Sequence, residues 1–206
     1  VTPDEEKVSG FVFKIQANMD PDHRDRVAFV RICSGRFLKG EQTSHMRTGK
    51  PIRLTNSTLL MGKDRSEIDE AFAGDVVGLF DPGIFRIGDT LSNEKDMHYA
   101  GIPIFAPESY MRVEVAGVQK RKALEKGIEQ LVQEGVVQLF SDPEGGSASW
   151  ILGAMGPLQF DVMRHRLKTE YGVDLTLSVL PYTMARWPQE GFDPEDFRYS
   201  ERIRVV

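Results

Sequence analysis

The chain has 206 residues, 40% of them hydrophobic and 28% charged, which is the balance of a folded globular protein. Its 31 Asp and Glu against 26 Lys and Arg give a formal net charge of −5, which excludes an overall cationic nucleic-acid binder but not a local basic patch. A single cysteine excludes an internal disulfide framework, and no apolar run reaches the roughly 18 residues of a membrane span. We therefore expect a cytoplasmic protein that does not bind membranes.

Short strand-like segments separated by turns fill the first half of the chain. Residues Gly10–Gln16 alternate in polarity, and we expect Phe11, Phe13 and Ile15 to share one face of a strand. Further strands are expected over residues 26–33, 52–54, 57–61, 75–80 and 90–91. Strands at this spacing, joined by Gly-rich turns, predict a β barrel over residues 1–105.

The second half alternates between strand and helix patterns. A strand over 110–115 is followed by a helix within 117–134, whose apolar stripe contains Leu124, Ile128, Leu131 and Val132. Two strands, over 136–140 and 150–155, precede a second helix that begins at Gly156-Pro157 and ends at Gly172, and a last strand covers 173–179. The order β-α-β-β-α-β predicts a ferredoxin-like α+β plait over residues 106–206.

Few residues suggest chemistry. Neither a P-loop nor a GxGxxG motif is present, and His23, His45, His98 and His165 lack the spacing of metal ligands. Cys33 ends an apolar strand without a neighbouring base, so we expect a buried structural thiol. The carboxylates of Asp64, Glu67, Asp69 and Glu70 are expected to form a solvated charge run. The motifs thus predict no catalytic residue, no cofactor-binding residue and no metal ligand.

Two polar loops carry clustered basic residues. His23, Arg24 and Arg26 lie in the first loop, and Lys63 and Arg65 lie in the second. Basic side chains in exposed loops can contact phosphates, and each such contact weakens as salt is added. The alternative is local ion pairing, because Asp20, Asp22 and Asp25 are interleaved with the first cluster.

Three short signatures occur in order in the first half: Arg31–Gly40 (RICSGRFLKG), Ala73–Gly78 (AGDVVG) and Ile87–Leu91 (IGDTL). They resemble the second domain of translational GTPases, the barrel shared by elongation factors Tu and G. Four further segments resemble the bacterial release factor 3 family within those GTPases. They are residues 11–29, 101–108, 156–162 and 183–187.

This resemblance implies a role that composition and periodicity do not show. Members of the family are GTPases that promote departure of class I release factors from the ribosome during translation termination, without reading the stop codon. Their GTP or GDP and Mg²⁺ bind an N-terminal GTPase domain. The 206 residues of this chain contain no motif of that domain. The resemblance thus implies a fragment with the second and third domains, no nucleotide site of its own, and three partners: the ribosome, class I release factors and the GTPase domain in cis. His23, Arg24, Arg26, Lys63 and Arg65 become candidate ribosomal RNA contacts.

Two other functions remain open at this point. A translocase fragment of the elongation factor G type would carry a similar barrel and plait. A regulatory module that binds small ligands is also compatible with a ferredoxin-like plait, because fold does not imply function. If a GTPase domain is absent, we expect an exposed apolar patch on the barrel or near the linker over residues 101–107.

Overall fold

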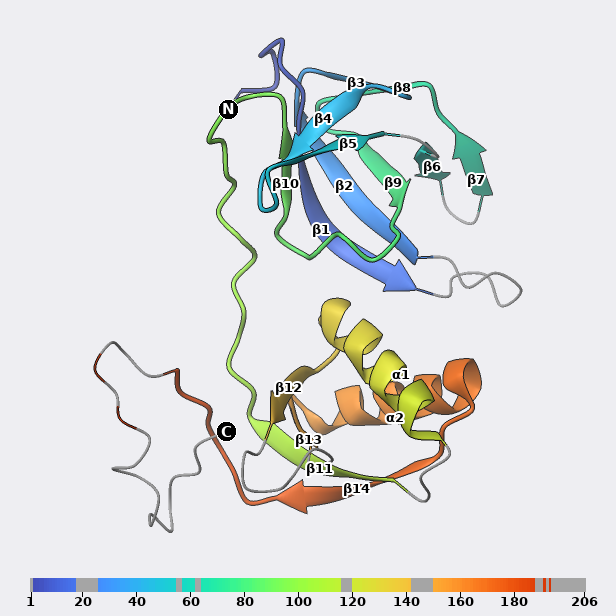
Figure 1. Ribbon diagram of the computed structural model, residues 1–206, viewed down its shortest axis with the longest axis vertical. Coiled ribbons are helices and arrows are strands. Elements are labelled where there is room, and N and C mark those ends of the chain that lie inside the picture. The colour runs from blue at the N-terminus through green and yellow to red at the C-terminus, as the bar shows by residue number, and fades with distance from the viewer. Residues whose placement is uncertain are drawn as a thin grey trace. The chain divides into compact units, whose positions relative to one another are not determined.

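The computed structural model describes residues 2–17, 26–54, 57–61, 64–115, 120–141 and 150–187, together with 191 and 193. The chain divides into two compact units, Val1–Pro103 and Ile104–Val206 (Figure 1). We call them the barrel unit and the plait unit. The domain boundary predicted at residues 105 and 106 stays a prediction.

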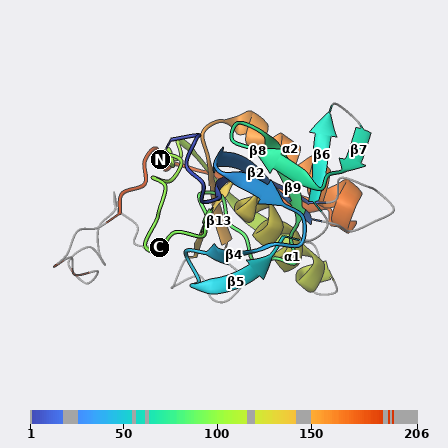
Figure 2. The same ribbon diagram turned by 90° about the horizontal axis from the view of Figure 1, so that it is seen from above.

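The barrel unit is built from ten strands in its described part. They are β1 (Ser9–Ala17), β2 (Arg26–Ser34), β3 (Arg36–Leu38), β4 (Gln42–His45), β5 (Lys50–Arg53), β6 (Ser57–Met61), β7 (Asp64–Glu67), β8 (Glu70–Phe72), β9 (Val76–Phe80) and β10 (Thr90–Ser92). Eight of them form one curled antiparallel sheet in the order β5-β4-β10-β1-β2-β9-β6-β7, and β3 pairs with β8 in a second sheet. Figure 2 shows β2 beside β9, which pair from Val27 with Phe80 to Arg31 with Val76. The β-barrel class predicted from the sequence is confirmed.

The strand β1 differs from the expected alternation. Val12 and Ile15 are buried at 0% and 1% exposure, whereas Phe13 is 36% exposed, so Phe13 does not share a face with Ile15. The reason is an irregularity between Val12 and Lys14, where the pairing with β2 shifts. One extra residue in a strand moves each following side chain to the other face.

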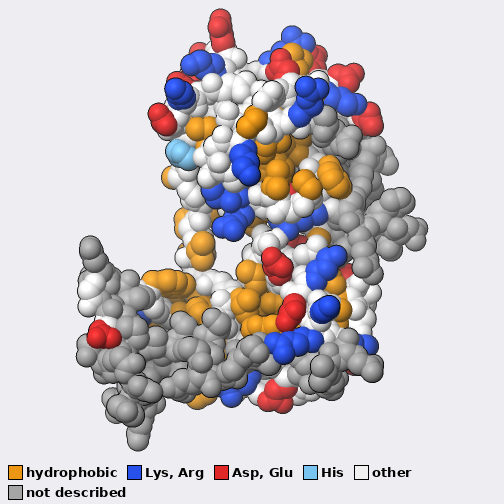
Figure 3. All heavy atoms as spheres, viewed as in Figure 1, with side chains coloured by type: hydrophobic (Ala, Val, Ile, Leu, Met, Phe, Trp, Pro, Cys, Tyr) orange, Lys and Arg blue, Asp and Glu red, His pale blue; other side chains and the backbone are white. Residues whose placement is uncertain are grey.

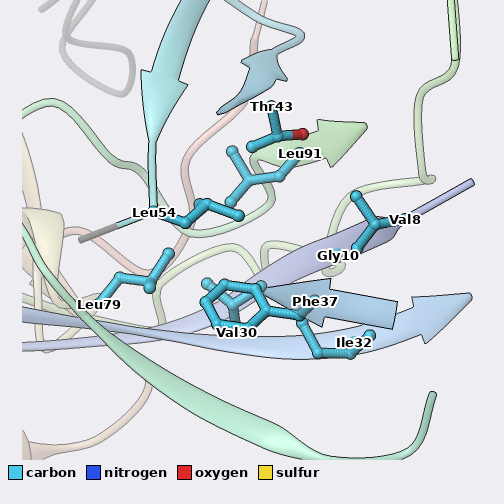
Figure 4. Close-up of a pocket in the computed structure, with 9 residues that line it drawn as sticks. All are labelled: Val8, Gly10, Val30, Ile32, Phe37, Thr43, Leu54, Leu79 and Leu91. Carbon is cyan, nitrogen blue, oxygen red and sulfur yellow. The ribbon is translucent and has the colours of Figure 1, made fainter. Parts of the chain in front are cut away.

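The barrel core is apolar and closely packed. Figure 4 shows side chains from β2, β3, β4, β9 and β10 around a cavity of about 10 Å³, with Thr43 the one polar side chain labelled there. This space is at the lower limit for a single water molecule. Gly10 is required beside it, because a Cβ at this position would lie 2.7 Å from Val30 Cγ1. The cavity is therefore a packing feature and not a ligand site.

The plait unit has the expected order of elements. They are β11 (Ser109–Val115), α1 (Arg121–Gln133), β12 (Gln138–Ser141), β13 (Trp150–Ala154), α2 (Pro157–Tyr171) and β14 (Leu175–Leu180). The sheet order is β12-β13-β11-β14, all antiparallel, so β11 lies between the third and fourth strands of the unit. Both helices cover one face of this sheet (Figure 1). The ferredoxin-like plait is confirmed.

Local sequence explains the helix limits. Pro157 occupies the first helical position of α2, and Gln159 Oε1 accepts hydrogen bonds from the backbone N–H groups of Met155 and Gly156 at 2.8 and 3.2 Å. Gly172 ends the helix with φ of 64°, a left-handed conformation that glycine adopts without strain. The expected stripe of α1 is also confirmed, since Leu124, Ile128 and Leu131 are buried.

Candidate functional site

The five candidate basic residues differ in what the structure describes of them. His23, Arg24 and Lys63 lie outside the described residues. Arg65 lies in β7, opposite Leu60 of β6, and its side chain is outside the described part. Arg26 is the first residue of β2 and is only 7% exposed.

The Arg26 guanidinium holds the loop that follows β9. Its Nε lies 2.6 Å from Asp81 Oδ2, and its Nη2 donates a 2.9 Å hydrogen bond to the Phe85 carbonyl. Asp81 Oδ1 accepts hydrogen bonds from three successive backbone N–H groups, those of residues 83, 84 and 85, at 2.8, 2.8 and 3.2 Å. A phosphate contact from Arg26 would therefore require the displacement of Asp81. Arg26 stands at the edge of the predicted basic cluster but serves an internal ion pair.

A second buried network fixes the other end of the same loop. The carboxylate of Asp89 accepts a 2.7 Å hydrogen bond from His45 Nε2 and a 2.6 Å hydrogen bond from Arg47 Nε. Burial disfavours the charged form of Asp89. Hydrogen bonds from Arg47, from the Arg86 backbone N–H and from His45 outweigh that penalty and hold the pKa of this carboxyl below its usual range. From the sequence alone, His45 has no expected role.

The signal for His45 was present in its strand. Thr43 and His45 alternate with exposed Gln42 and Ser44 on β4, and both are buried. A buried histidine needs a polar partner, and Asp89 of the IGDTL signature provides it. The pair was missed because His45 and Asp89 are 44 residues apart in the sequence.

The segment from Phe80 to Phe85 and strand β5 enclose a groove of about 170 Å³, which we call the β5 groove. Ile52 and Arg53 line it from β5, Phe80 lines it from the end of β9, and Ile84 lines it from the loop that follows. Its floor contains the buried side chains of Leu54 and Phe85. In Figure 3 hydrophobic side chains gather on this face of the barrel unit, with Lys and Arg side chains beside them.

Hydrophobic side chains are also exposed near the linker. Ile102, Ile104 and Phe105 are exposed at 43%, 81% and 66%. The backbone beside them is held in place, since Gln138 Nε2 donates a 2.8 Å hydrogen bond to the Phe105 carbonyl. Exposed apolar side chains on an ordered segment are typical of a contact surface.

The remaining chemical expectations can be compared with the structure. Cys33 is partly exposed, so the expected buried thiol is wrong. The expected charge run contains strands β7 and β8, and two of its members are paired, because Lys39 Nζ lies 2.7 Å from Glu67 Oε2 and Arg36 pairs with Glu70. Within the described residues, no group of three His, Cys, Asp or Glu could hold a metal ion. No helix of this part is long and apolar enough to cross a membrane.

Comparisons with protein families agree with this two-unit architecture. Residues 7–94 match a family described as "Elongation factor G domain 2", and residues 99–205 match one described as "Class II release factor RF3, C-terminal domain". A crystal structure of a Thermus thermophilus protein superposes with a TM-score of 0.70 at 25% identity, covering 85% of this chain and 26% of that chain. Barrel and plait together define a translation factor of the elongation and release factor type.

The similar proteins narrow this class. The chain is 48% identical over 207 residues to "Peptide chain release factor 3" of Symbiobacterium thermophilum, covering 100% of this chain and 39% of that protein. It is 49% identical over 187 residues to the protein of the same name from Gloeobacter violaceus, covering 91% of this chain and 35% of that protein. The match to the release factor 3 C-terminal domain, over residues 99–205, covers more than half of the chain. The chain therefore belongs to the peptide chain release factor 3 family. It spans less than two-fifths of the length of these relatives.

Proposed function

We propose that this chain is the ribosome-binding, non-catalytic part of a release factor 3. The whole protein would use GTP to promote departure of class I release factors from the ribosome, in the cytoplasm and without reading the stop codon. The observation that carries the proposal is the match of residues 99–205 to the release factor 3 family together with a barrel over 7–94. The first of these matches favours a termination factor over a translocase.

The nucleotide would bind outside these residues. We propose that the rest of the polypeptide contains the GTPase domain, with its GTP or GDP and Mg²⁺, and that this domain packs on the exposed side chains of Ile104 and Phe105 in the plait unit. Covering such apolar side chains is favourable at about 25 cal/mol per Å². A change of nucleotide could then alter which surfaces of barrel and plait face the ribosome.

We assign contact with ribosomal RNA to two basic segments of the barrel unit, residues 23–24 and residues 63–65, of which Arg65 lies in strand β7. We propose His23, Arg24, Lys63 and Arg65 as phosphate contacts, in a protein whose net charge of −5 otherwise opposes RNA binding. Arg26 would contribute through its ion pair with Asp81, which fixes the start of β2 directly after the first loop.

The test measures how tightly a release factor 3 of full length, which contains this chain, co-sediments with ribosomes. Arg24→Glu combined with Lys63→Glu should weaken binding by about tenfold or more and reduce its dependence on salt, because two phosphate contacts are lost. Lys95→Glu, a charge reversal at an exposed lysine of another turn, is the matched control. Equal affinity and equal salt dependence in both variants would overturn the assignment of these segments.

A further inference from the structure

The β5 groove combines an apolar interior with an uncompensated cationic rim. Its wall residues Ile52, Phe80 and Ile84 are hydrophobic, and Arg53 is the one charged residue that lines it. Lys50 and Arg86 are exposed on the same two segments. Among the residues that the structure describes, no ion pair involves Lys50, Arg53 or Arg86.

The described acidic residues of this region leave a net positive charge: Glu41, whose carbonyl accepts a hydrogen bond from the Leu54 N–H, is the exposed one, and the other two are bound elsewhere. Asp81 and Asp89 are buried at 2% and 4% exposure, and both are engaged by other partners. Asp81 pairs with Arg26, and Asp89 binds His45 and Arg47. The groove therefore presents positive charge on a chain whose net charge is −5.

One wall of the groove is held in place by hydrogen bonds to its backbone. Two consecutive carbonyls of that wall are bound by arginines: Arg47 Nη2 donates to the Ile84 carbonyl at 2.7 Å, and Arg26 Nη2 donates to the Phe85 carbonyl at 2.9 Å. The N–H groups of Ile84 and Phe85 are bound by Asp81. A wall that is already ordered loses little conformational entropy when a partner binds.

These bonds also decide which chemistry fits the groove. The backbone groups of Ile84 and Phe85 are already engaged, and the side chains on the wall are apolar. A nucleobase buried here could hydrogen-bond only to Arg53, so the donors on its edge would stay unsatisfied, which costs free energy. A leucine or phenylalanine side chain needs no such partner, and a carboxylate next to it would meet Arg53.

We propose that the β5 groove binds an acidic peptide segment of a partner protein, with one bulky apolar side chain seated between Ile52 and Ile84 and an adjacent carboxylate on Arg53. The site lies on segments other than the two basic segments assigned to RNA contact. It also differs from the linker residues assigned to the GTPase domain. The inference therefore does not depend on the proposed function.

The test measures fluorescence anisotropy of a fluorescein-labelled peptide, Glu-Asp-Leu-Phe-Glu-Asp-Glu, titrated with the 206-residue chain. Arg53→Glu and Ile84→Ser should each weaken binding by about tenfold or more. Arg31→Glu and Phe72→Ser are matched controls, because both residues are exposed and neither lines the groove, and they should change affinity by less than about twofold. Circular dichroism and thermal melting of each variant establish that it is folded.

Changes in the probe separate the two parts of the proposed ligand. Replacing Leu and Phe of the peptide by Ser, or its acidic residues by Asn and Gln, should each weaken binding by about tenfold. Three results would overturn the proposal: binding that the groove variants leave unchanged, tighter binding of a poly(U) oligonucleotide that depends on Arg53, and loss of peptide binding in a protein of the relatives' full length. The last result would assign the groove to the rest of the same polypeptide.

Discussion

The two units bury different kinds of side chain. All nine buried polar or charged residues found in the described part of the chain lie in the barrel unit: Ser9, Arg26, Ser34, Thr43, His45, Asp81, Asp89, Thr90 and Ser92. In the plait unit, the described residues buried as a whole are hydrophobic and pack on α1 and α2, and a largely buried ion pair joins Arg166 of α2 to Glu134, whose side chains are 20% and 6% exposed. The barrel's loop conformation therefore depends on specific charge pairs, whereas the plait depends mainly on apolar packing and has one such network among its described residues, around Arg166.

This difference follows from what each unit has to order. Antiparallel strands and helices satisfy their own backbone groups, so the plait needs few buried polar side chains. The segment between β9 and β10 has no such pairing over most of its length, and the carboxylates of Asp81 and Asp89 bind its backbone N–H groups instead. Charges buried for this purpose must be neutralised, which explains Arg26, His45 and Arg47.

The largest effect is expected from breaking one of these charge pairs. Asp81→Ala removes the partner of Arg26 and three backbone hydrogen bonds, and should destabilise the barrel unit by about 3–5 kcal/mol. Native-state hydrogen exchange of core amides in β1 and β2 measures this free energy for the barrel unit separately. Asp4→Asn, at an exposed carboxylate, is the control, with an expected change below about 0.5 kcal/mol. A loss for Asp81→Ala as small as that of the control would contradict the role of the pair.

In the plait unit the comparable loss should come from a cavity. Leu152 of β13 has no exposed surface, and Leu152→Ala should cost about 2–5 kcal/mol of unfolding free energy in this unit. Leu158 of α2 is 72% exposed, so Leu158→Ala is the matched control. This substitution should leave the unfolding free energy nearly unchanged. Hydrogen exchange in β11 reports the effect. Equal effects of the two substitutions would show that apolar packing does not govern this unit.

A smaller effect tests how closely the two plait helices pack. A Cβ at Gly127 of α1 would lie 2.5 Å from Leu167 Cδ2 and 3.1 Å from Tyr171 Cγ, both of α2. Alanine gains about 1 kcal/mol in helix propensity, but overpacking costs about 1–3 kcal/mol, so Gly127→Ala should destabilise by about 1 kcal/mol. The neighbouring exposed Lys126→Ala should stay close to neutral in the same denaturation experiment. A stabilised Gly127→Ala variant would mean that the helices adjust freely.

The smallest effect concerns acid. Because the pKa of Asp89 is lower in the folded than in the unfolded chain, its stabilising contribution is complete above about pH 4 and is lost as pH falls through the folded-state pKa. The melting temperature of Asp89→Asn should therefore lie below that of the wild type at neutral pH and approach it in acid. Asp96→Asn, at an exposed position, should follow the wild-type profile. A difference between wild type and Asp89→Asn that is constant with pH would contradict this assignment.

Local patterns predicted the fold well where periodicity and turn residues agreed. The stripe of α1 and the Pro157 and Gly172 limits of α2 follow from short-range rules. The strand face of Phe13 could not be predicted, because the shift between Val12 and Lys14 is visible only in the pairing with β2. Strands β7 and β8 were hidden by their charges: Glu67 of β7 pairs with Lys39, which follows β3, and Glu70 of β8 pairs with Arg36 of the neighbouring strand β3.

The candidate site was less predictable, because its parts come together only in three dimensions. Arg26 was singled out as a basic loop residue, yet its partner Asp81 is distant in sequence, and burial of the pair depends on the pairing of β2 with β9. The β5 groove joins residues 52–54 to residues 79–85, which no single motif contains. The basic residues of the two segments remain predictions.

The central claim is that barrel and plait bind the ribosome while the chemistry lies elsewhere in the polypeptide. It is tested most directly by the release of a fluorescent class I release factor from terminated ribosomes in the presence of GTP. A protein of the relatives' full length should accelerate this release and hydrolyse GTP, whereas the 206-residue chain alone should do neither. Acceleration with GTP hydrolysis by the 206-residue chain alone, or an unchanged rate when the full-length protein lacks these residues, would contradict the claim.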